Sequence, residues 1–420
     1  MSRMTSVFAL DDFERRARLR LPKPIFAFVQ SGAEDQQALN ENLASFSQWS
    51  LTPRSLVDVS VRSQATKLFG TTYSSSFGIA PMGGGMMCGY QVDLALARAA
   101  GEAEIPFILS GASTTALEAV VDQAPRSWFQ AYLAADLGRI DGLLERLRRA
   151  RVEVLVVTTD VPVMGNRENA LRAGFSMPPV FSPRLLWEGV SHPAWLFGCL
   201  VQTLVRDGVP RQANFDADIG DSILAPPRAS GDWRSRLTWE HVRHIRRSWR
   251  GRLILKGVLS VEDARQARAV GADGVIVSNH GGRQLSSAVA PMHVLPQIRD
   301  AARDMVVLID GGLRRGGDVL KARAAGADFV LVGRPFLYAA AVAGQAGVSR
   351  AIAILRQEID RDLALIGCPD FKNLDAGWLQ DSGMYRAASG GSLRTQPSPR
   401  TKSTEPVPWR KRAAPRTPAQ

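Results

Sequence analysis

Short runs of apolar and β-branched residues recur along the chain and alternate with amphipathic stretches. The runs VLVVT, GVIVS and FVLVG are apolar almost throughout, as in parallel strands that are buried on both faces. Amphipathic segments such as 91–104, 139–149 and 261–270 follow most of these runs. This alternation predicts an α/β fold, a (β/α)8 TIM barrel over about residues 77–370. Its strands are predicted at Phe77–Ala80, Ile105–Leu109, Trp128–Tyr132, Glu153–Thr158, Arg252–Lys256, Gly274–Ser278, Met305–Ile309 and Asp328–Val332.

The regular spacing of these strands is interrupted once. Strand starts lie roughly 20–32 residues apart, but about 100 residues separate the starts of the fourth and fifth strands. We therefore expect a long loop insertion, about residues 161–250, after the fourth strand. Before the barrel, Leu10–Ser31 and Gln36–Phe46 are charge-rich and amphipathic, which predicts an N-terminal helical lid on the bottom or side of the barrel. Residues 1–384 form the predicted folded domain.

Composition changes the picture mainly at the C-terminus. Hydrophobic residues make up 45% and charged residues 22% of the 420-residue chain, as in a folded globular protein. The formal charge is +12, but eight of the 52 basic residues and only one acidic residue lie in 386–420, so the rest carries about +5. Segment 385–420 is rich in Pro, Ser and Thr and is predicted to be a disordered basic tail. No recognition module precedes it, so we expect no nucleic-acid partner.

The three cysteines, Cys88, Cys199 and Cys368, are widely spaced. They suggest neither a disulfide framework nor a metal site, which favours a reducing cytoplasm. The longest nearly apolar run, 194–205, is shorter than the roughly 20 residues that span a bilayer, so no transmembrane helix is expected. The acidic N-terminal segment is unlike a secretory signal.

Every predicted strand ends in polar side chains or glycine. Because a TIM barrel places its active site at the carboxyl ends of its strands, these residues predict one shared site. In strand order they are Met82 and Gly83, Ser110, Gln130 and Tyr132, Thr158 and Asp160, Lys256, Ser278 and His280, Asp310 and Gly312, and Gly333 and Arg334.

The last two strands carry a candidate phosphate site. DGGLRRG and VGRP each combine glycines with an arginine, Arg314 and Arg334 respectively. Free backbone N–H groups, a helix N-terminus and guanidinium groups together bind anions, and many barrels hold a phosphate after strands seven and eight. The alternative is a pair of tight turns with surface arginines.

His280 is a candidate general base. A lone histidine is more often structural, but Asp160 ends the fourth strand and could orient the imidazole. Arg167 and Arg283 could bind a carboxylate as a fork. For Lys256 the residues leave three readings open: a Schiff-base lysine, a structural ion pair, or a cation beside an electron-accepting ring.

Several motifs resemble one enzyme family. I-A-P, W-F-Q-A-Y, V-T-T-D-V-P, L-K-G-V, S-N-H-G-G-R-Q, D-G-G-L-R-R-G and V-G-R-P are similar to those of the FMN-dependent L-2-hydroxy-acid dehydrogenases and oxidases. The resemblance runs from about Val7 to Gly383 and is greatest to the mandelate dehydrogenase group, through Q-W-S-L-T-P-R-S-L-V-D-V-S, H-P-A-W-L and I-G-C-P-D. It implies oxidation of a mandelate-like or lactate-like L-2-hydroxy acid to the 2-oxo acid by a homotetramer.

The resemblance also implies the residues that hold FMN. Backbone at Met82 and Gly83 would lie against the flavin ring, and Lys256 would stabilise the negative charge of the reduced ring. Asp310 would hold the ribityl chain. The implied FMN-binding set is Met82, Gly83, Ser110, Gln130, Thr158, Lys256, Ser278, Asp310, Gly312, Arg314, Gly333 and Arg334.

For the substrate, the resemblance makes His280 the group that removes a proton and Asp160 the group that stabilises the imidazolium. Arg167 and Arg283 would bind the carboxylate, and Tyr132 would contact a substrate oxygen. Hydride transfer and a carbanion route both remain open. No metal ion is implied.

Three positions depart from the family pattern or bear on the substrate. Phe26 stands where the family has a tyrosine that contacts the substrate carboxylate. The lost hydrogen bond to a charged group would cost about 1.5–3 kcal/mol. Met82 replaces a residue that is usually threonine, and Ala112 leaves room where glycolate oxidases carry a bulky aromatic.

The insertion bears on where the electrons go. Between Val180 and Phe215 it is rich in Leu, Val, Phe and Trp with flanking arginines, which predicts an interfacial patch, with a packed loop helix as the alternative. Membrane-bound relatives use this loop to reach quinone, so the resemblance implies a quinone acceptor and peripheral association with the cytoplasmic face of the inner membrane. The alternatives are a soluble oxidase that makes hydrogen peroxide and an FMN-binding barrel with weak or lost activity.

Overall fold

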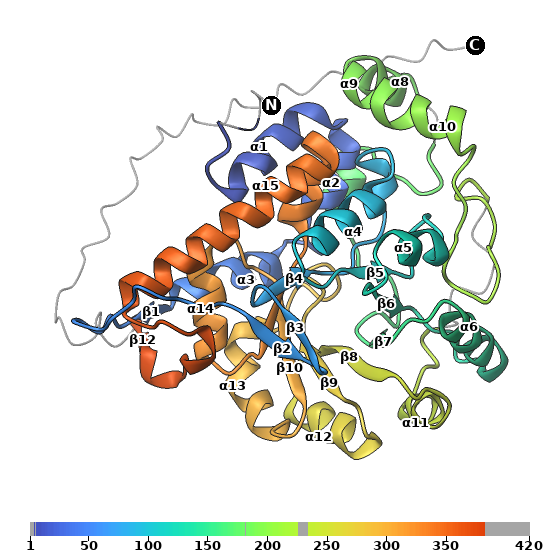
Figure 1. The fold of residues 1–420 in the computed structure, drawn as a ribbon. Helices are drawn as coiled ribbons and strands as arrows, with labels where there is room; N and C mark the ends of the chain where they lie inside the picture. The colour runs from blue at the N-terminus through green and yellow to red at the C-terminus, as the bar shows by residue number, and fades with distance from the viewer. Residues whose placement is uncertain (1–3, 5, 181, 226–233, 383–420) are drawn as a thin grey trace, which may run out of the picture. The chain divides into compact units, whose positions relative to one another are not determined.

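The computed structural model describes residue 4 and residues 6–180, 182–225 and 234–382 (Figure 1). Within residues 1–382 the chain forms one compact unit. The predicted basic tail, 385–420, lies outside the described residues.

Eight parallel strands form the predicted (β/α)8 barrel, and all eight predicted strands are present. Seven neighbouring pairs are hydrogen-bonded along the order β4-β11-β10-β9-β8-β7-β6-β5. A single parallel bridge between Ile79 and Phe107 joins the two end strands and completes the ring. The strands are β4 Phe77–Ile79, β5 Ile108–Ser110, β6 Trp128–Ala131, β7 Val154–Thr158, β8 Arg252–Val258, β9 Gly274–Val277, β10 Val306–Asp310 and β11 Phe329–Val332.

Alternate residues of each strand face two separate cores. Val154 and Val156 belong to the cluster inside the barrel, whereas Leu155 and Val157 pack outward against the helices. Since successive strand side chains point to opposite faces, an unbroken apolar run fills both cores. The hairpin of β2 (Thr66–Leu68) and β3 (Thr71–Tyr73) contributes Leu68 to the inner cluster and so closes the amino-terminal end of the barrel.

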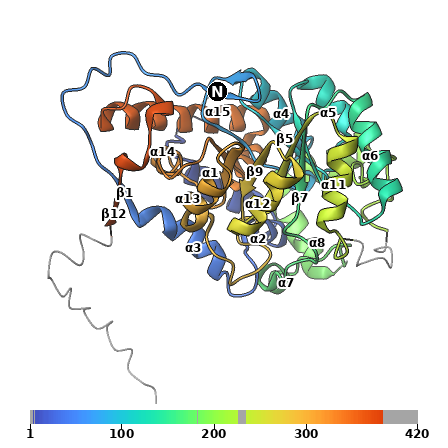
Figure 2. The ribbon, with the colours of Figure 1, turned by 90° about the horizontal axis from the view of Figure 1, so that it is seen from below.

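Helices surround the strands on the outside (Figure 2). The barrel helices are α4 Val92–Glu102, α5 Leu117–Gln123, α6 Leu137–Arg149, α11 Trp239–Ser248, α12 Val261–Val270, α13 Pro291–Ala301, α14 Gly316–Ala324 and α15 Arg334–Ile366. Among the described residues, only α15 is long and apolar enough to cross a bilayer. It packs against α1, α4 and α14 and is interrupted by non-helical backbone at Ala343 and Gly344.

The predicted lid differs from expectation in two respects. The segment 10–31 forms two helices, α1 (Leu10–Arg20) and α2 (Lys23–Gln30), because Pro22 and Pro24 interrupt a single helix and favour a new start. In addition, α2 reaches the rim of the barrel at the carboxyl ends of the strands, whereas the sequence predicted only the bottom or side. The backbone oxygens of Phe28 and Val29 accept hydrogen bonds from arginines of this rim. The third helix is α3 (Gln37–Ser47), and α1 packs on α15.

The insertion after β7 contains several short helices joined by irregular segments. Its later part includes α11, which is an ordinary outer helix of the barrel, so the excursion ends before Trp239. Four elements, α8, α9, η2 and α10, follow one another at the upper right of Figure 1. The helices of the insertion before α11 are α7 Glu168–Arg172, α8 Pro183–Val190, α9 Pro193–Trp195, the π-helix η2 Leu196–Val201 and α10 Gln202–Arg206. The remaining elements of the chain are β1 Trp49–Leu51, β12 Leu379–Asp381, and the 3-10 helices η1 Gly85–Met87, η3 Phe371–Asn373 and η4 Ala376–Trp378.

Candidate active site

A layer of polar side chains lies above the inner core at the carboxyl ends of the strands. Each of them comes two positions after a core residue that points into the barrel. Because side chains two positions apart on a strand point to the same face, the polar side chains also point inward. Ile254 precedes Lys256 in this way, and Leu308 precedes Asp310. The six residues of this layer are Ser110, Gln130, Thr158, Lys256, Ser278 and Asp310.

Hydrogen bonds order one half of this layer. Ser110 Oγ donates to Gln130 Oε1 at 3.0 Å, and Gln130 Nε2 donates to Thr158 Oγ1 at 2.8 Å. All three side chains are buried. These two hydrogen bonds fix the orientation of the Gln130 amide. They leave a row of polar groups along three adjacent strands.

A buried cation occupies the other half. Lys256 Nζ lies 2.9 Å from Asp310 Oδ2 and donates to Ser278 Oγ at 2.7 Å. Burial opposes the charge of Lys256, but Asp310 and Asp160 outweigh it and raise its pKa above the usual value. The second oxygen of Asp310, Oδ1, is buried without a hydrogen-bond partner among the described residues. Lys256 is therefore an ion-paired ammonium at the floor of the site, which favours the ion-pair and cation readings over a Schiff-base lysine.

His280 stands at the rim in a pair with Asp160. Its Nδ1 is 2.9 Å from Asp160 Oδ1, and its Nε2 is 3.3 Å from the Tyr132 hydroxyl. Burial opposes the charge of Asp160, but His280 and Lys256 outweigh it and lower its pKa, so the carboxylate is ionised at neutral pH. This places a carboxylate behind the imidazole and leaves Nε2 toward the cavity, as a general base requires.

Phe28 lies between two of the predicted carboxylate-binding arginines. The guanidinium carbons of Arg283 and Arg167 lie 5.0 and 5.3 Å from the centroid of its ring. The ring also stacks on Phe175, with centroids 4.3 Å apart. Phe28 was not among the predicted site residues, because only the fold brings α2 to this rim. Arg167 Nε is buried and has no hydrogen-bond partner in the described part of the chain.

The arginines of the site carry unbalanced charge. Among the described residues, none of Arg167, Arg283, Arg314 and Arg334 forms an ion pair with a carboxylate. Burial, followed by repulsion from neighbouring arginines, lowers the pKa of Arg283 well below its usual value and that of Arg334 to about 10. A bound anion would relieve both effects, so this region is built for negatively charged groups.

Glycines bring backbone close to these arginines. Gly311 and Gly312 have φ of +97° and +87°, in the left-handed region that favours glycine. A Cβ on Gly281 would lie 3.1 Å from Arg334 Nη1. The cavity is thus narrow where the loop after β9 meets Arg334 of the second predicted phosphate loop.

Most of these groups line one cavity of about 130 Å³, but Ser110, Gln130, Thr158, Asp160, Arg167 and Ser278 are not among its lining residues. Phe26 is not among its lining residues; it is buried against Tyr338, with ring centroids 5.8 Å apart, whereas Phe28 lines the wall. The predicted residues that line the cavity are Met82, Gly83, Tyr132, Lys256, His280, Arg283, Asp310, Gly312, Arg314, Gly333 and Arg334.

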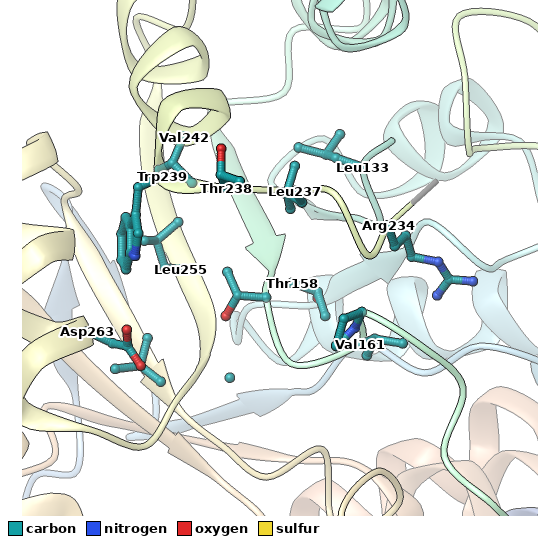
Figure 3. Close-up of a pocket in the computed structure, with 14 residues that line it drawn as sticks. Leu133, Thr158, Val161, Arg234, Leu237, Thr238, Trp239, Val242, Leu255 and Asp263 are labelled. Atoms are coloured by element: carbon teal, nitrogen blue, oxygen red, sulfur yellow. The ribbon is translucent and has the colours of Figure 1, made fainter. Parts of the chain in front are cut away.

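A second cavity, of about 250 Å³, lies outside the barrel wall (Figure 3). Trp239 and Asp263 line one side and Leu133 and Arg234 the other. It shares Thr158 with the polar layer but none of the arginines of the first cavity or His280. The described residues contain no cluster of three or more His, Cys, Asp or Glu side chains suited to a metal ion.

Comparisons with known proteins agree with this geometry. The sequence profile of the FMN-dependent dehydrogenases matches residues 17–381. The chain belongs to this family. It is 39% identical over 386 residues to (S)-mandelate dehydrogenase of Pseudomonas putida, covering 91% of this chain and 96% of that protein. It is 35% identical over 373 residues to L-lactate dehydrogenase of Yersinia pestis, covering 86% and 95%.

A solved structure of this family has the same fold. The crystal structure of the monotopic membrane protein (S)-mandelate dehydrogenase superposes with a TM-score of 0.80 at 38% identity, covering 90% of this chain and all of that one. Membership of the family makes this chain an FMN-dependent dehydrogenase, with FMN as its cofactor.

The residues of the first cavity fit FMN. Arginines without ion-pair partners and left-handed glycines suit a phosphate. The unpartnered Oδ1 of Asp310 suits a hydroxyl-bearing chain, and Lys256 suits a ring that gains negative charge.

Proposed function

We propose that the protein oxidises an L-2-hydroxy acid of the mandelate type to the 2-oxo acid. The observation that carries this proposal is the His280–Asp160 pair, which faces a cavity whose arginines have no carboxylate partner among the described residues. A base and a pair of arginines are what a 2-hydroxy carboxylate needs: the base takes a proton and the arginines hold the carboxylate. The family and its mandelate and lactate dehydrogenase members support 2-hydroxy-acid oxidation.

His280 accepts a proton from the substrate at Nε2, and Asp160 stabilises the imidazolium through Nδ1. Arg167 and Arg283 hold the carboxylate, and Tyr132 contacts a substrate oxygen. Oxidation removes two protons and two electrons from the substrate: one proton goes to His280, the second proton and the two electrons would go to the cofactor, and the C–O single bond becomes a carbonyl. FMN, when bound, supplies the two-electron acceptor.

This chain's residues hold the cofactor by different chemistry at each part. Ser110, Gln130, Thr158 and Ser278 would offer hydrogen bonds to the polar edge of the flavin ring, and Lys256 would supply a positive charge to it. Backbone at Met82 and Gly83 would contact the ring. Asp310 would bind the ribityl hydroxyls, and Gly312, Arg314, Gly333 and Arg334 would bind the phosphate.

The base assignment is tested with His280→Ala. The variant should fold and bind FMN, but under anaerobic conditions a 2-hydroxy acid should bleach its flavin about 10²–10⁴-fold more slowly than in the wild type, the usual contribution of a positioned base. His293→Ala is a matched control, because His293 is an exposed residue on α13 that bonds Gln48. Reduction of the His280 variant at the wild-type rate would make the proposed reaction wrong. A wild-type protein that binds FMN but is reduced by no 2-hydroxy acid would be a barrel without this activity.

The mandelate-like preference rests on space beside the ring-binding loop. Gly83 has no side chain and Ala112 has only a methyl group. A Cβ on Gly83 would lie 2.8 Å from that methyl, so a larger side chain at either position would fill this part of the rim. Stopped-flow reduction with mandelate, phenyllactate, lactate and glycolate compares the substrates. Mandelate or phenyllactate should be the fastest. Faster reduction by glycolate or lactate would reject the aromatic preference.

We further propose that electrons leave to a membrane quinone. The insertion exposes an apolar patch that includes Trp187, 70% exposed, Phe197, 65% exposed, and Val205, 78% exposed. Trp195 and Cys199 instead face the barrel and donate hydrogen bonds to the backbone carbonyls of Met87 and Met86, respectively. These bonds hold the helices on the barrel while the patch faces outward. Such a surface suits the headgroup boundary of a bilayer. A mandelate dehydrogenase of similar fold is described as a monotopic membrane protein.

Cell fractionation and rapid mixing with oxygen test this together. The protein should sediment with membranes, attached at the cytoplasmic face, and its reduced flavin should react slowly with oxygen. A soluble protein that makes peroxide at its turnover rate would be an oxidase instead. A tetramer, as the family resemblance implies, is checked by sizing in detergent.

A further inference from the structure

We propose that Asn42, on the lid helix α3, is a positioning residue that holds the loop of His280 in place for catalysis. The inference rests on the proposed role of His280 as the base. Asn42 lies on a different helix or strand from every residue assigned to the site, and its side chain reaches the loop after β9.

Asn42 and Asn279 form a reciprocal pair of side-chain hydrogen bonds. Asn42 Nδ2 donates to Asn279 Oδ1 at 2.7 Å, and Asn279 Nδ2 donates to Asn42 Oδ1 at 2.7 Å. The two residues are 1% and 3% exposed. Because water is excluded, these bonds do not exchange readily with solvent, and the pair fixes the two amides relative to each other.

Asn279 passes this constraint to its neighbour His280. Asn279 Oδ1 also accepts from Gly282 N–H at 3.0 Å, and Asn279 Nδ2 also donates to the Val289 carbonyl at 3.2 Å. The bond between Asn279 and Gly282 closes a turn that contains His280. His280 has a φ of +58° there, a conformation that a residue with a side chain seldom adopts. Its N–H donates to Ser278 Oγ at 3.0 Å. The amide pair therefore anchors a strained turn whose one functional side chain is the base.

Other contacts between lid and loop lie further from the base. Ala33 N–H donates to the Gly282 carbonyl at 2.8 Å, and Ala38 N–H donates to the Ser286 carbonyl at 2.7 Å. They remain when the Asn42 side chain is removed, so the loop should stay docked. Among the hydrogen bonds between lid and loop in the described residues, only the amide pair reaches a residue next to His280, so its loss should change the orientation of the imidazole rather than the fold.

The backbone of Asn42 has a separate role. A Cβ on Gly312 would lie 2.0 Å from the Asn42 carbonyl oxygen, so α3 packs directly on the predicted phosphate loop. Replacing the Asn42 side chain leaves this contact intact. The Asn42 amide also lies beside Gly311, where a Cβ would lie 3.2 Å from Nδ2, but it makes no hydrogen bond to that loop among the described residues. Loss of the side chain should therefore affect proton removal much more than FMN binding, which depends on the backbone contact.

Asn42→Ala in the FMN-loaded enzyme tests the proposal. The rate of anaerobic flavin reduction by mandelate should fall about ten- to hundredfold, as expected for a small misplacement of a catalytic group. The kinetic isotope effect with substrate deuterated at C2 should rise, because bond cleavage then limits the rate more fully. The FMN dissociation constant should stay within about twofold of wild type. Asn40→Ala, an exposed asparagine on the same helix, should change none of these.

The results separate a positioning role from a structural one. A wild-type rate and isotope effect in Asn42→Ala would overturn the proposal, and so would parallel losses of rate and FMN affinity, which indicate a purely structural residue. If Asn42→Ala does not fold, Asn42→Asp replaces it: the carboxylate can accept from Asn279 but cannot donate, so a smaller loss of rate is expected, and no loss would reject the idea.

Failure of this inference is distinguishable from failure of the proposed function. If His280→Ala is inactive while Asn42→Ala behaves as wild type, the base assignment stands and the role of Asn42 is wrong. If His280→Ala reduces at the wild-type rate, the base assignment itself is wrong. A double variant, Asn42→Ala with Asn279→Ala, should be no slower than Asn279→Ala alone, because the two amides act through one interaction.

Discussion

Arg283 combines a structural role with its proposed role in substrate binding. One nitrogen, Nη1, donates to the backbone oxygens of Phe28, Val29 and Ser31 at 2.8, 3.1 and 2.8 Å. These bonds tie the rim to the end of α2. Its second terminal nitrogen, Nη2, has no hydrogen-bond acceptor among the described residues and is the one available for a substrate carboxylate.

We predict that Arg283→Lys keeps FMN but binds substrate poorly. An ammonium has three donors and can satisfy the three backbone oxygens, but no second nitrogen is left for the carboxylate. Loss of a charge-assisted bond worth about 1.5–3 kcal/mol should raise KM roughly ten- to hundredfold. Steady-state kinetics and flavin content measure the two effects. Arg303→Lys, at an exposed position, is the control, and an equal loss of FMN would contradict the prediction.

Phe28 acts on the same arginines through its ring. Two guanidinium groups lie within 5.3 Å of its centroid, and the face of the ring is electron-rich. We predict that Phe28→Leu raises KM for the hydroxy acid about three- to thirtyfold, since a cation–π contact contributes about 0.5–2 kcal/mol. Phe8→Leu, 75% exposed, is the control. An unchanged KM would mean that the ring only fills space.

At the scale of elements, the strands and the residues at their ends are predictable because they follow a local rule. A strand of alternating inner and outer positions places Lys256 above Ile254 and Asp310 above Leu308, so the sequence alone indicates the polar layer. The lid is not predictable in this way. Pro22 marks a break between helices, but which rim residues α2 and α3 touch depends on contacts between distant segments.

Asn42 and Phe28 illustrate what local pattern cannot supply. Asn42 is a polar residue in an amphipathic helix, with no sequence feature that distinguishes it from the exposed Asn40. Its partner Asn279 is 237 residues away. Phe26 shows the converse, since the resemblance places a substrate contact there and the structure buries the side chain against Tyr338.

The packing of α3 on the loop after β10 gives a prediction at this scale. Gly312→Ala should force α3 away, because the new Cβ would lie 2.0 Å from the Asn42 carbonyl oxygen. We expect FMN affinity to fall about tenfold or more, since the loop belongs to the proposed phosphate cradle. Gly344→Ala is a matched control: its φ is also positive, at +55°, but a Cβ there meets nothing within 4 Å. Equal FMN affinity in the two variants, measured by fluorescence titration, would reject the clash.

For the whole molecule, charge and apolar surface are unevenly distributed. Most of the formal +12 comes from the segment beyond the barrel domain, because that segment holds eight basic residues and one acidic residue. The exposed apolar patch of Trp187, Phe197 and Val205 lies on the insertion. The apolar patch favours the headgroup boundary of a bilayer, and the basic segment favours anionic lipid. Stable peripheral binding generally needs two such contributions.

We predict that deletion of residues 383–420 weakens binding to vesicles containing anionic lipid about tenfold or more. Each basic residue near a charged surface contributes up to about 1 kcal/mol, and salt screens this attraction within a Debye length of about 8 Å. Binding to neutral vesicles should be unchanged, because it depends on the apolar patch. Trp187→Ser with Phe197→Ser should instead reduce binding to both kinds of vesicle. The deletion should leave flavin reduction by mandelate unaltered, and cosedimentation at low and high salt measures the difference. If the shortened protein binds anionic vesicles as tightly as the full chain and with the same salt dependence, the tail plays no part in attachment and the patch alone accounts for it.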